Sequence, residues 1–354
     1  MLQCVGAARF VYNWALANWT EMYDAYKNGA SSVKPDCVVL LRKWTEEKPD
    51  WAKEIPRCVA TQAVRQVGIA FKTMWQGHGK YPKFHKKYRG ANTFYADNAH
   101  AHIHGDYVYL PRIGNIRMSE NLRYNGKIMA YTVIYFAGQW HVSVRVELSY
   151  DARVTCENKD SIVGIDVGLK NIATASDGSV LKLSEKLKRL EKHQRVQRRR
   201  CSKAQRGSKN AYKKQIKYQR TLLRIRNIKE DAVHKFTSMI TKNHGIIVTE
   251  TLDLRGMMAT ATGRSHRHLL SGSLMSRVLL YLDYKAQKHI SAPRLFPSSK
   301  RCSHCGHVKD VLPLSARVYE CSECGIHIDR DLNAAYNLMQ IGQGMPSVPV
   351  EVVP

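Results

Sequence analysis

Residues 302–335 read CSHCGHVKDVLPLSARVYECSECGIHIDRDLNAA, and this stretch decides the fold expected around it. Two Cys-x2-Cys pairs, Cys302 with Cys305 and Cys321 with Cys324, are separated by fifteen residues. Thiolates at this spacing can converge on one tetrahedral Zn²⁺, with each pair on a tight turn. The stretch therefore predicts a zinc ribbon with these four cysteines as ligands.

The same stretch continues into a predicted helix that opens with a carboxylate, Asp331. Two further carboxylates end predicted apolar strands upstream: Asp166 follows residues 162–165, and Glu250 follows residues 245–249. A ribonuclease H-like sheet would bring three such positions together. Clustered carboxylates repel one another unless cations neutralise them, and two Mg²⁺ ions about 3.5–4 Å apart can promote phosphodiester hydrolysis. Taken singly, each acid has a simpler interpretation as a solvated strand end or, for Asp331, a helix cap.

The charge of the chain favours a polyanionic partner. Its 354 residues, enough for two or three domains, include 56 Lys and Arg against 29 Asp and Glu, a formal net charge of +27. That excess argues against an ordinary enzyme of small metabolites and favours nucleic acid or an anionic membrane. Because no apolar run approaches the roughly 20 residues of a membrane span and no secretory signal is recognisable, nucleic acid is the stronger interpretation. The five cysteines outside the two pairs are scattered, which fits free thiols in a reducing cytoplasm.

The pattern of residues divides the chain into consecutive parts. Periodicity, turn signals and charge predict helices at 1–78, and a basic aromatic segment at 80–89 that leads into a small antiparallel β-barrel within 79–160. They then predict an α/β part at 161–297, the zinc ribbon at 298–326, a C-terminal helix within 327–341, and a disordered tail at 342–354. The α/β part holds a predicted helical hairpin at 184–242 with a break near 202–208. From 182 to 242 there are 21 Lys and Arg against 4 Asp and Glu, which favours a nucleic-acid backbone as its partner.

Three finer predictions concern the α/β part. Residues 162–183 predict a three-stranded antiparallel meander, because turn signals separate three apolar runs. Residues 271–290 predict a helix, and residues 293–297 predict a short strand that leads to the zinc ribbon. The fold class expected is therefore a multidomain α+β protein, with the ribbon inserted into a ribonuclease H-like domain.

Several motifs resemble those of the TnpB proteins, which insertion sequences encode and which are related to type V CRISPR effectors. The resemblance covers nearly the whole chain and is carried by residues 9–14, 81–84, 110–114, 164–174, 298–305 and 321–335. It implies an RNA-guided DNA endonuclease with a RuvC-like nuclease domain, a wedge barrel, a helical recognition lobe, and a zinc ribbon that loads the target strand. The implied cofactors are two Mg²⁺ ions and one structural Zn²⁺. The implied partners are a guide RNA from the 3′ end of the mobile element and double-stranded target DNA beside a short target-adjacent motif.

The resemblance also assigns the acids. It places Asp166, Glu250 and Asp331 at the catalytic site, with Asp331 a better match than Asp329 and Glu250 a better match than Asp253. Contacts to nucleic acid are expected from the predicted recognition helix, the barrel, the basic segment and the hairpin, at Gln62, Arg65, Gln66, Lys83, Lys86, Lys87, Thr93, Arg198, Arg199 and Arg200.

One departure from the family and three alternatives stay open on the sequence. Relatives carry a longer segment before the motif at 9–14, including a first strand of the wedge barrel, so translation starts further upstream or the barrel lacks an edge strand. A nuclease-dead or truncated RNA-guided DNA-binding protein would share most of these features, although all three acids are present here. A DNA-strand-transfer transposase could use three acids but would not need the ribbon, and a plain zinc-ribbon DNA-binding factor would leave most of the chain unexplained.

Overall fold

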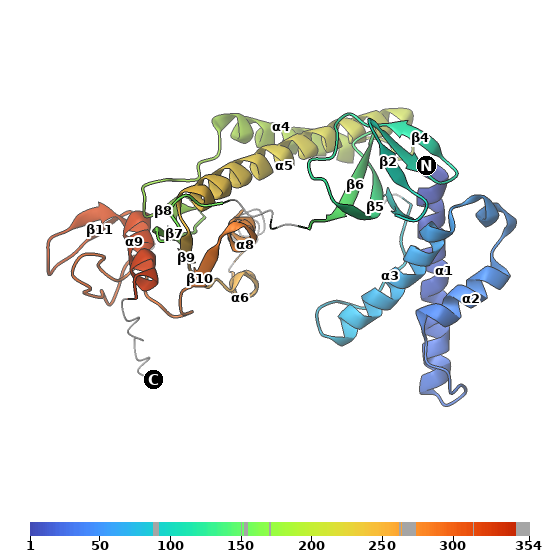
Figure 1. Cartoon of the computed structure of the whole chain (residues 1–354), viewed down its shortest axis with the longest axis horizontal. Coiled ribbons are helices and arrows are strands. Elements are labelled where there is room, and N and C mark those ends of the chain that lie inside the picture. Colours follow the sequence, from blue (N-terminus) through green and yellow to red (C-terminus); the bar gives the residue numbers. More distant parts are fainter. Residues whose placement is uncertain are drawn as a thin grey trace. The chain divides into compact units, whose positions relative to one another are not determined.

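The computed structural model of the chain describes residues 1–87, 92–149, 151, 155–169, 171–261, 263, 274–313 and 315–344. It contains two compact units, Met1–Asp151 and Ala152–Pro354, which are considered separately here (Figure 1). Among the described residues, none of the helices has the length and apolar character needed to cross a bilayer.

The first unit begins with three α-helices, α1 (Leu2–Lys27), α2 (Cys37–Glu47) and α3 (Arg57–Trp75), with a short 3-10 helix, η1 (Asp50–Glu54), between the last two. Apolar residues at helix spacing form their common core, in which the Trp19 and Phe71 rings stack with centroids 5.3 Å apart. The side chain of Asp36 caps α2 by accepting a hydrogen bond from the Val38 amide.

The rest of the first unit is two small antiparallel sheets. One has the order β1 (Asn92–Asp97), β5 (Lys127–Phe136), β6 (Gln139–Glu147); the other contains β2 (His102–His104), β3 (Tyr107–Leu110) and β4 (Gly114–Arg117). Ala137 and Gly138 join β5 to β6 with positive φ angles of 55° and 80°, as a tight hairpin turn requires. The two sheets share a core with Val5 of α1 and Val59 of α3.

The second unit is built on a mixed sheet with the strand order β10 (Lys288–Ser291), β9 (Ile246–Thr249), β7 (Ile162–Asp166), β8 (Thr174–Ala175). β7, β9 and β10 are parallel, and β8 runs antiparallel to β7. The buried side chains alternate between the two faces, because successive residues of a strand point in opposite directions. Val163 and Ile247 pack against α5 (Lys209–Asn243) and α8 (Met275–Lys285), whereas Val248 packs against Leu338 of α9 (Arg330–Gly342).

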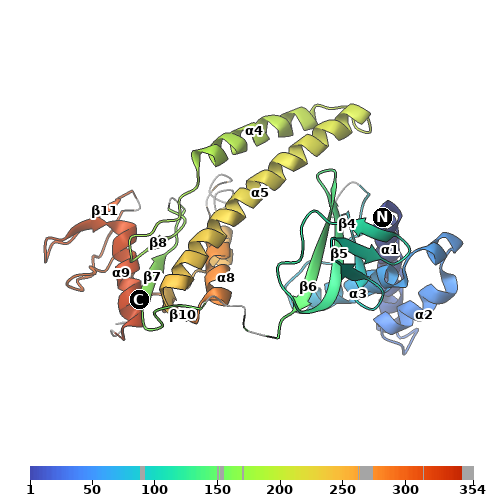
Figure 2. The ribbon, with the colours of Figure 1, turned by 45° about the horizontal axis from the view of Figure 1, so that its top comes forward.

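Further elements of the second unit extend from this sheet. Helix α4 (Glu185–Ser202) packs along α5 as an antiparallel hairpin (Figure 2). A short helix, α6 (Leu254–Thr260), follows β9, and the hairpin of β11 (Val318–Glu320) and β12 (His327–Asp329) precedes α9.

Three expectations for this unit need correction. The meander at 162–183 is reduced, since β8 has two residues and Val180 contributes only an isolated bridge to Thr174. The helix expected to reach residue 290 ends at Lys285, and residues 288–291 instead extend the sheet beside β9. Residues 293–297 form no strand, because their two prolines lack the amide hydrogen that a ladder needs. Residues 271–273 lie outside the described part of the chain.

A buried lysine sits where α8 packs against α5. Lys285 is only 8% exposed, and its Nζ donates hydrogen bonds to Thr237 Oγ1 at 2.8 Å and to Ser238 Oγ at 3.0 Å. Burial lowers the pKa of Lys285 to about 8, since a charged ammonium group is poorly solvated there.

Lys285→Met should therefore change how stability depends on pH. Between pH values of about 8 and 10.5, the unfolded chain keeps the Lys285 proton that the folded chain has released, so raising the pH stabilises the wild type through this residue. We expect the difference in Tm, wild type minus variant, to increase over that range in thermal unfolding of the chain free of nucleic acid. A difference that stays constant would show that Lys285 titrates normally.

Candidate active site and metal centre

Three carboxylates lie near one another at one end of the four-stranded sheet. Asp166 is the last residue of β7 and Glu250 directly follows β9, and these parallel neighbours pair Ile165 with Thr249. Their next residues therefore leave the sheet side by side, at the carboxyl ends of strands where α/β proteins commonly bind ligands. Asp331 lies in the first turn of α9, close enough for its charge to act on Asp166.

A glycine allows α9 to lie this close to the sheet. A Cβ atom at Gly164 of β7 would approach the Ala335 carbonyl oxygen and the Met339 amide nitrogen of α9 more closely than 3.0 Å. Both are backbone atoms, which cannot rotate away. The bare backbone at Gly164 thus allows α9 to cross β7 in contact and to bring Asp331 towards Asp166.

The electrostatics of the cluster are those of crowded, partly desolvated acids. Burial, followed by the charges of Glu250 and Asp331, raises the pKa of Asp166 well above its ordinary value. Burial also raises the pKa of Glu250, opposed by its hydrogen bond from Ser298 and by the charge of Arg330. A divalent cation would relieve this repulsion, and carboxylate oxygens are the ligands that Mg²⁺ prefers.

Two residues outside the predicted set orient the carboxylates. Asn171 Nδ2 donates a hydrogen bond to Asp331 Oδ2 at 2.9 Å, and the Ser298 hydroxyl donates one to Glu250 Oε1. Both lie in the motifs at 164–174 and 298–305, but nothing in the sequence assigned them to a particular acid. The contact of Asn171 with Asp331 links residues 160 positions apart, which only the fold can show.

Asp329 and Asp253, the two alternatives to Asp331 and Glu250, both make contacts that stabilise the fold. Asp329 is the N-cap of α9, where its Oδ1 accepts from the amides of Asp331 and Leu332 at 2.9 and 3.1 Å. Asp253 likewise caps α6 and forms an ion pair with Arg294 at 3.0 Å. The helix-cap interpretation therefore belongs to Asp329 rather than to Asp331.

The four predicted zinc ligands form a compact thiol cluster. The Sγ atoms of Cys302, Cys305, Cys321 and Cys324 all lie within 4.8 Å of one another, with separations of 3.6 Å between Cys302 and Cys324 and 3.5 Å between Cys305 and Cys321. Zn–S bonds of about 2.3 Å in a tetrahedron place sulfurs roughly 3.8 Å apart, so the cluster fits zinc. Among the described residues, only these four cysteines gather their ligand atoms at the spacing of a single ion.

Buried amides join the thiol cluster to the helix that carries Asp331. Asn333 Nδ2 donates to the Arg301 carbonyl at 2.7 Å, and its Oδ1 accepts from the Ser303 amide at 2.9 Å. Asn337 Nδ2 donates to the carbonyls of Ser298 and Arg301 at 2.8 and 2.7 Å. Both asparagine side chains are on α9 and fully buried, so the first cysteine turn is held against this helix.

The predicted nucleic-acid residues of α3 lie partly in a groove. Gln62 and Arg65 line a cavity of about 520 Å³, together with residues of β1 and of the β3–β4 turn; we call it the α3 groove. Gln66 is exposed on α3 without lining the groove, and Thr93 is paired with Ile134 in the sheet, also outside it.

The predicted basic residues are at the surface. Lys83, Lys86 and Lys87 are exposed in the segment after α3, where the neighbouring His85 ring stacks on Tyr12 with centroids 3.9 Å apart. Residues 88 and 89 of this segment lie outside the described part. In α4, the predicted contact residues are also exposed: Arg198, Arg199 and Arg200.

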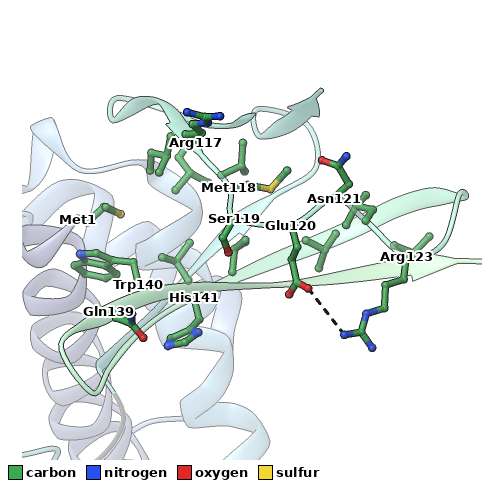
Figure 3. Close-up of a pocket in the computed structure, with 18 of the residues that line it drawn as sticks. Met1, Arg117, Met118, Ser119, Glu120, Asn121, Arg123, Gln139, Trp140 and His141 are labelled. Carbon is green, nitrogen blue, oxygen red and sulfur yellow. Dashed lines mark ion pairs between the residues drawn. The ribbon is translucent and has the colours of Figure 1, made fainter. Parts of the chain in front are cut away.

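A further cavity of the first unit, of about 650 Å³, lies between the two small sheets (Figure 3). Its lining includes Met1, Trp140 on β6 and the 118–124 segment, while β6 pairs only with β5 among the described strands. None of the predicted site residues lines this cavity.

Family models match three parts of the chain. Residues 141–261 match the OrfB_IS605 model, described as "Probable transposase", and residues 276–338 match the "Cas12f1-like, TNB domain" model. Residues 1–28 match a "Helix-turn-helix domain" model, and in the structure this match coincides with the single helix α1.

Similar proteins extend along nearly the whole chain. A protein of Streptomyces pristinaespiralis named "Putative RNA-guided DNA endonuclease" is 30% identical, over 95% of this chain and 84% of its own length. "Putative RNA-guided DNA endonuclease InsQ" of Escherichia coli K12 is 27% identical, over 98% of this chain and 89% of its own. A cryo-EM structure of a Cas12f1-sgRNA-target DNA complex shares the fold, with a TM-score of 0.58 and 14% identity over 96% of this chain and 81% of that one.

Proposed function

Because the chain belongs to the TnpB family of insertion-sequence proteins, we propose that it is an RNA-guided DNA endonuclease that hydrolyses phosphodiester bonds at Asp166, Glu250 and Asp331. The observation that carries the proposal is that Asp166 and Glu250 leave the ends of β7 and β9 side by side, with Asp331 on α9 near enough that burial and the charges of the other two acids raise the pKa of Asp166. Burial together with neighbouring acids is the arrangement by which active sites shift the pKa of a carboxyl group, and this supports a catalytic role for the three acids.

The acid cluster suits two Mg²⁺ ions, held by Asp166, Glu250 and Asp331. Magnesium bound there would lower the pKa of the attacking water and neutralise the charge that develops on the leaving oxygen. The residues around the acids set their positions: Asn171 fixes one oxygen of Asp331, and Ser298 fixes one oxygen of Glu250.

The rest of the chain is assigned on the same proposal. Residues 161–297, with the hairpin 184–242, and residues 327–341 would form the RuvC-like nuclease domain, with the zinc ribbon at 298–326. The order of β10, β9, β7 and β8, with helices on both faces, supports a ribonuclease H-like sheet. Residues 1–78 would be the recognition lobe and 79–160 the wedge domain. The tail expected from 342 begins after Gly342, which is the last residue of α9, and residues 345–354 lie outside the described part.

The partners would be a guide RNA from the 3′ end of the mobile element and a DNA duplex. The charge of +17 carried by residues 182–242, with Arg198, Arg199 and Arg200 exposed, suits the backbone of the RNA or of a guide–target heteroduplex. Lys83, Lys86 and Lys87 would add to this surface. In the α3 groove, Gln62 and Arg65 can contact base edges of a short target-adjacent motif. Gln66 and Thr93 lie outside the groove, so we assign them a smaller share of these contacts.

The cysteines support a reducing compartment and a zinc ion. None of the nine cysteines forms a disulfide, so we place the protein in the cytoplasm. Four of them would bind Zn²⁺ as thiolates. The ion would join the second cysteine turn to the first, which Asn333 and Asn337 hold against α9.

Cys321→Ser is expected to remove this zinc. One hydroxyl in place of a thiolate leaves an incomplete tetrahedron, so zinc content should fall from one ion per chain to nearly none, with loss of DNA cutting as the turn beside α9 loosens. Metal content by mass spectrometry and a cutting assay provide the measurement. Cys201→Ser, a lone cysteine on α4, is the matched control and should keep both properties. Full zinc content in Cys321→Ser would contradict the assignment.

The function is tested by co-expressing the chain with DNA from the 3′ end of its element and sequencing the RNA that co-purifies. The preparation is then incubated with Mg²⁺ and a plasmid library that carries the guide-matched target beside random flanking sequence. We expect cutting that depends on the RNA and on a flanking motif. Bound RNA without cutting would indicate a binding protein, whereas no RNA together with strand joining would indicate a transposase.

A further inference from the structure

A second cavity adjoins the α3 groove and has a different chemical character. It has a volume of about 420 Å³, lies among α1, α2, η1 and α3, and contains Trp44 and Trp51; we call it the tryptophan pocket. It shares five lining residues with the α3 groove: Pro56, Arg57, Thr61, Arg65 and Arg112. A nucleic acid that lies in the groove would therefore also reach the mouth of the pocket.

The inside of the tryptophan pocket is apolar and offers an aromatic surface. Trp44 is buried, at 6% exposure, and Leu41 and Ile55 line the cavity beside it. Trp51 is 44% exposed, and its ring contacts the Phe10 ring in a T-shaped arrangement, with centroids 5.2 Å apart and an interplanar angle of 84°. Trp51 thus presents a large indole surface at a defined position.

The rim of the pocket is cationic. Lys48, Lys53, Arg57, Arg65 and Arg112 all line it, and among the ion pairs found between described residues only Lys53 takes part, with Asp50. Arg57 and Arg65 lie eight residues apart on α3, two steps of four, so both face the same side of the helix. Such a rim attracts an anionic group.

Arg112 is held over the pocket in an unfavourable backbone conformation. It lies in the turn between β3 and β4 with a φ of 62°, the left-handed region that favours glycine. Its guanidinium donates a hydrogen bond to the Lys53 carbonyl across the pocket. Strained residues of this kind tend to occur where the side chain has a function.

We propose that the tryptophan pocket binds one nucleotide turned out of the stack of the bound nucleic acid. The base lies on Trp51, and the adjoining phosphates contact Arg57, Arg65 and Arg112. The inference rests on the proposed function, which supplies the nucleic acid. The cavity has the size of a site for one small ligand. A nucleotide has a flat base that can stack on Trp51 and a negative phosphate that can pair with the arginines. An acidic peptide would use the arginines but not the exposed indole.

Photocrosslinking of the full chain with its co-purified RNA and a target duplex tests this placement. 5-Iodouracil replaces uracil or thymine at successive positions, either in the RNA or in one DNA strand, and mass spectrometry locates the crosslinked residue. We expect one position to crosslink to Trp51, and the labelled strand identifies the source of the nucleotide. No crosslink to Trp51 from any position of either nucleic acid would overturn the proposal.

Two variants separate binding from folding. Trp51→Leu keeps an apolar side chain but removes the stacking surface, and Arg112→Gly removes the cation while relieving the backbone strain. We expect each to weaken affinity for the nucleic acid that crosslinks by about tenfold, with Arg112→Gly no less stable to heat than the wild type. Trp75→Leu, at a tryptophan 54% exposed outside the pocket, and Arg42→Ala on α2 are the controls and should bind normally.

The outcomes distinguish this inference from the proposed function. If the wild type cuts guide-matched DNA but both variants bind and cut as well as the controls, the pocket assignment is wrong and the nuclease proposal stands. If the wild type neither binds RNA nor cuts, the nuclease proposal fails first. Equal weakening by the variants and the controls would also overturn the pocket assignment, because the effect would then be one of general charge or packing.

Discussion

Asp166→Asn is expected to lower the rate of guide-dependent DNA cutting by about 1,000-fold or more, while RNA binding is retained. Asparagine keeps the shape of the side chain but removes the charge through which Asp166 would hold a divalent cation, and metal ions contribute several kcal/mol to such reactions. Cleavage of a guide-matched plasmid over time, with RNA retention measured in the same preparation, provides the readout.

The same substitution should leave the fold intact or stabilise it. The pKa of Asp166 is raised by burial and by Glu250 and Asp331, so at a pH above its ordinary pKa this carboxyl destabilises the folded state without metal. A neutral amide removes that repulsion, and Tm without Mg²⁺ should be equal to or higher than that of the wild type. A loss of activity accompanied by a rise in stability is typical of catalytic acids rather than of structural ones.

Two acids nearby provide matched controls for this result. Asp253→Asn and Asp329→Asn remove equal charge, and asparagine can still cap α6 and α9. Both should keep cutting near the wild-type level. If Asp166→Asn cut normally, or if Asp253→Asn abolished cutting with its fold intact, the assignment of the three acids would be wrong.

Gly164→Ala is expected to inactivate the protein through packing alone. The new methyl group would lie closer than 3.0 Å to backbone atoms of Ala335 and Met339, so α9 must move away from β7 and take Asp331 with it. Overpacking of this kind costs about 1–3 kcal/mol, and we expect a lower Tm together with loss of cutting. Thermal unfolding and the plasmid assay measure the two effects.

Gly6→Ala is the control for that substitution. A Cβ at Gly6 of α1 meets no atom within 4 Å, and alanine favours a helix interior over glycine by roughly 1 kcal/mol. This variant should therefore be as stable as the wild type or more so, and should cut DNA. Normal cutting by Gly164→Ala would show that α9 can shift without disturbing the acids.

The positions of the acids could be predicted because strand ends are visible in sequence. Asp166 and Glu250 each end an apolar run, and parallel strands place such ends together. The thiol cluster could be predicted for a similar reason, since each Cys-x2-Cys pair lies in a tight turn closed by local antiparallel pairing, at Arg301 and Val308 for the first pair and in the β11–β12 hairpin for the second. In both cases local pattern and spacing carry the information.

Other features depend on packing that the sequence pattern does not contain. Whether Asp329 or Asp331 caps the helix depends on where α9 begins, and helix boundaries shift easily by one or two residues. The strand at Lys288–Ser291 has no strong alternation and forms because β9 offers a free edge beside it. The link between Asn171 and Asp331 spans the sheet and α9, so it follows from the assembled fold.

The docking of α9 against β7 also determines when the cluster of Asp166, Glu250 and Asp331 is completed during synthesis of the chain. Ribosomes add roughly 5–20 residues per second, and parts made first can fold first. Asp166 and Glu250 can be in place while the ribbon and α9 are still untranslated, because Asp331 comes 81 residues after Glu250. An emerging chain therefore carries an incomplete set of acids, and the full negative charge that would attract magnesium forms only once residues 330–342 have left the ribosome and packed over Gly164.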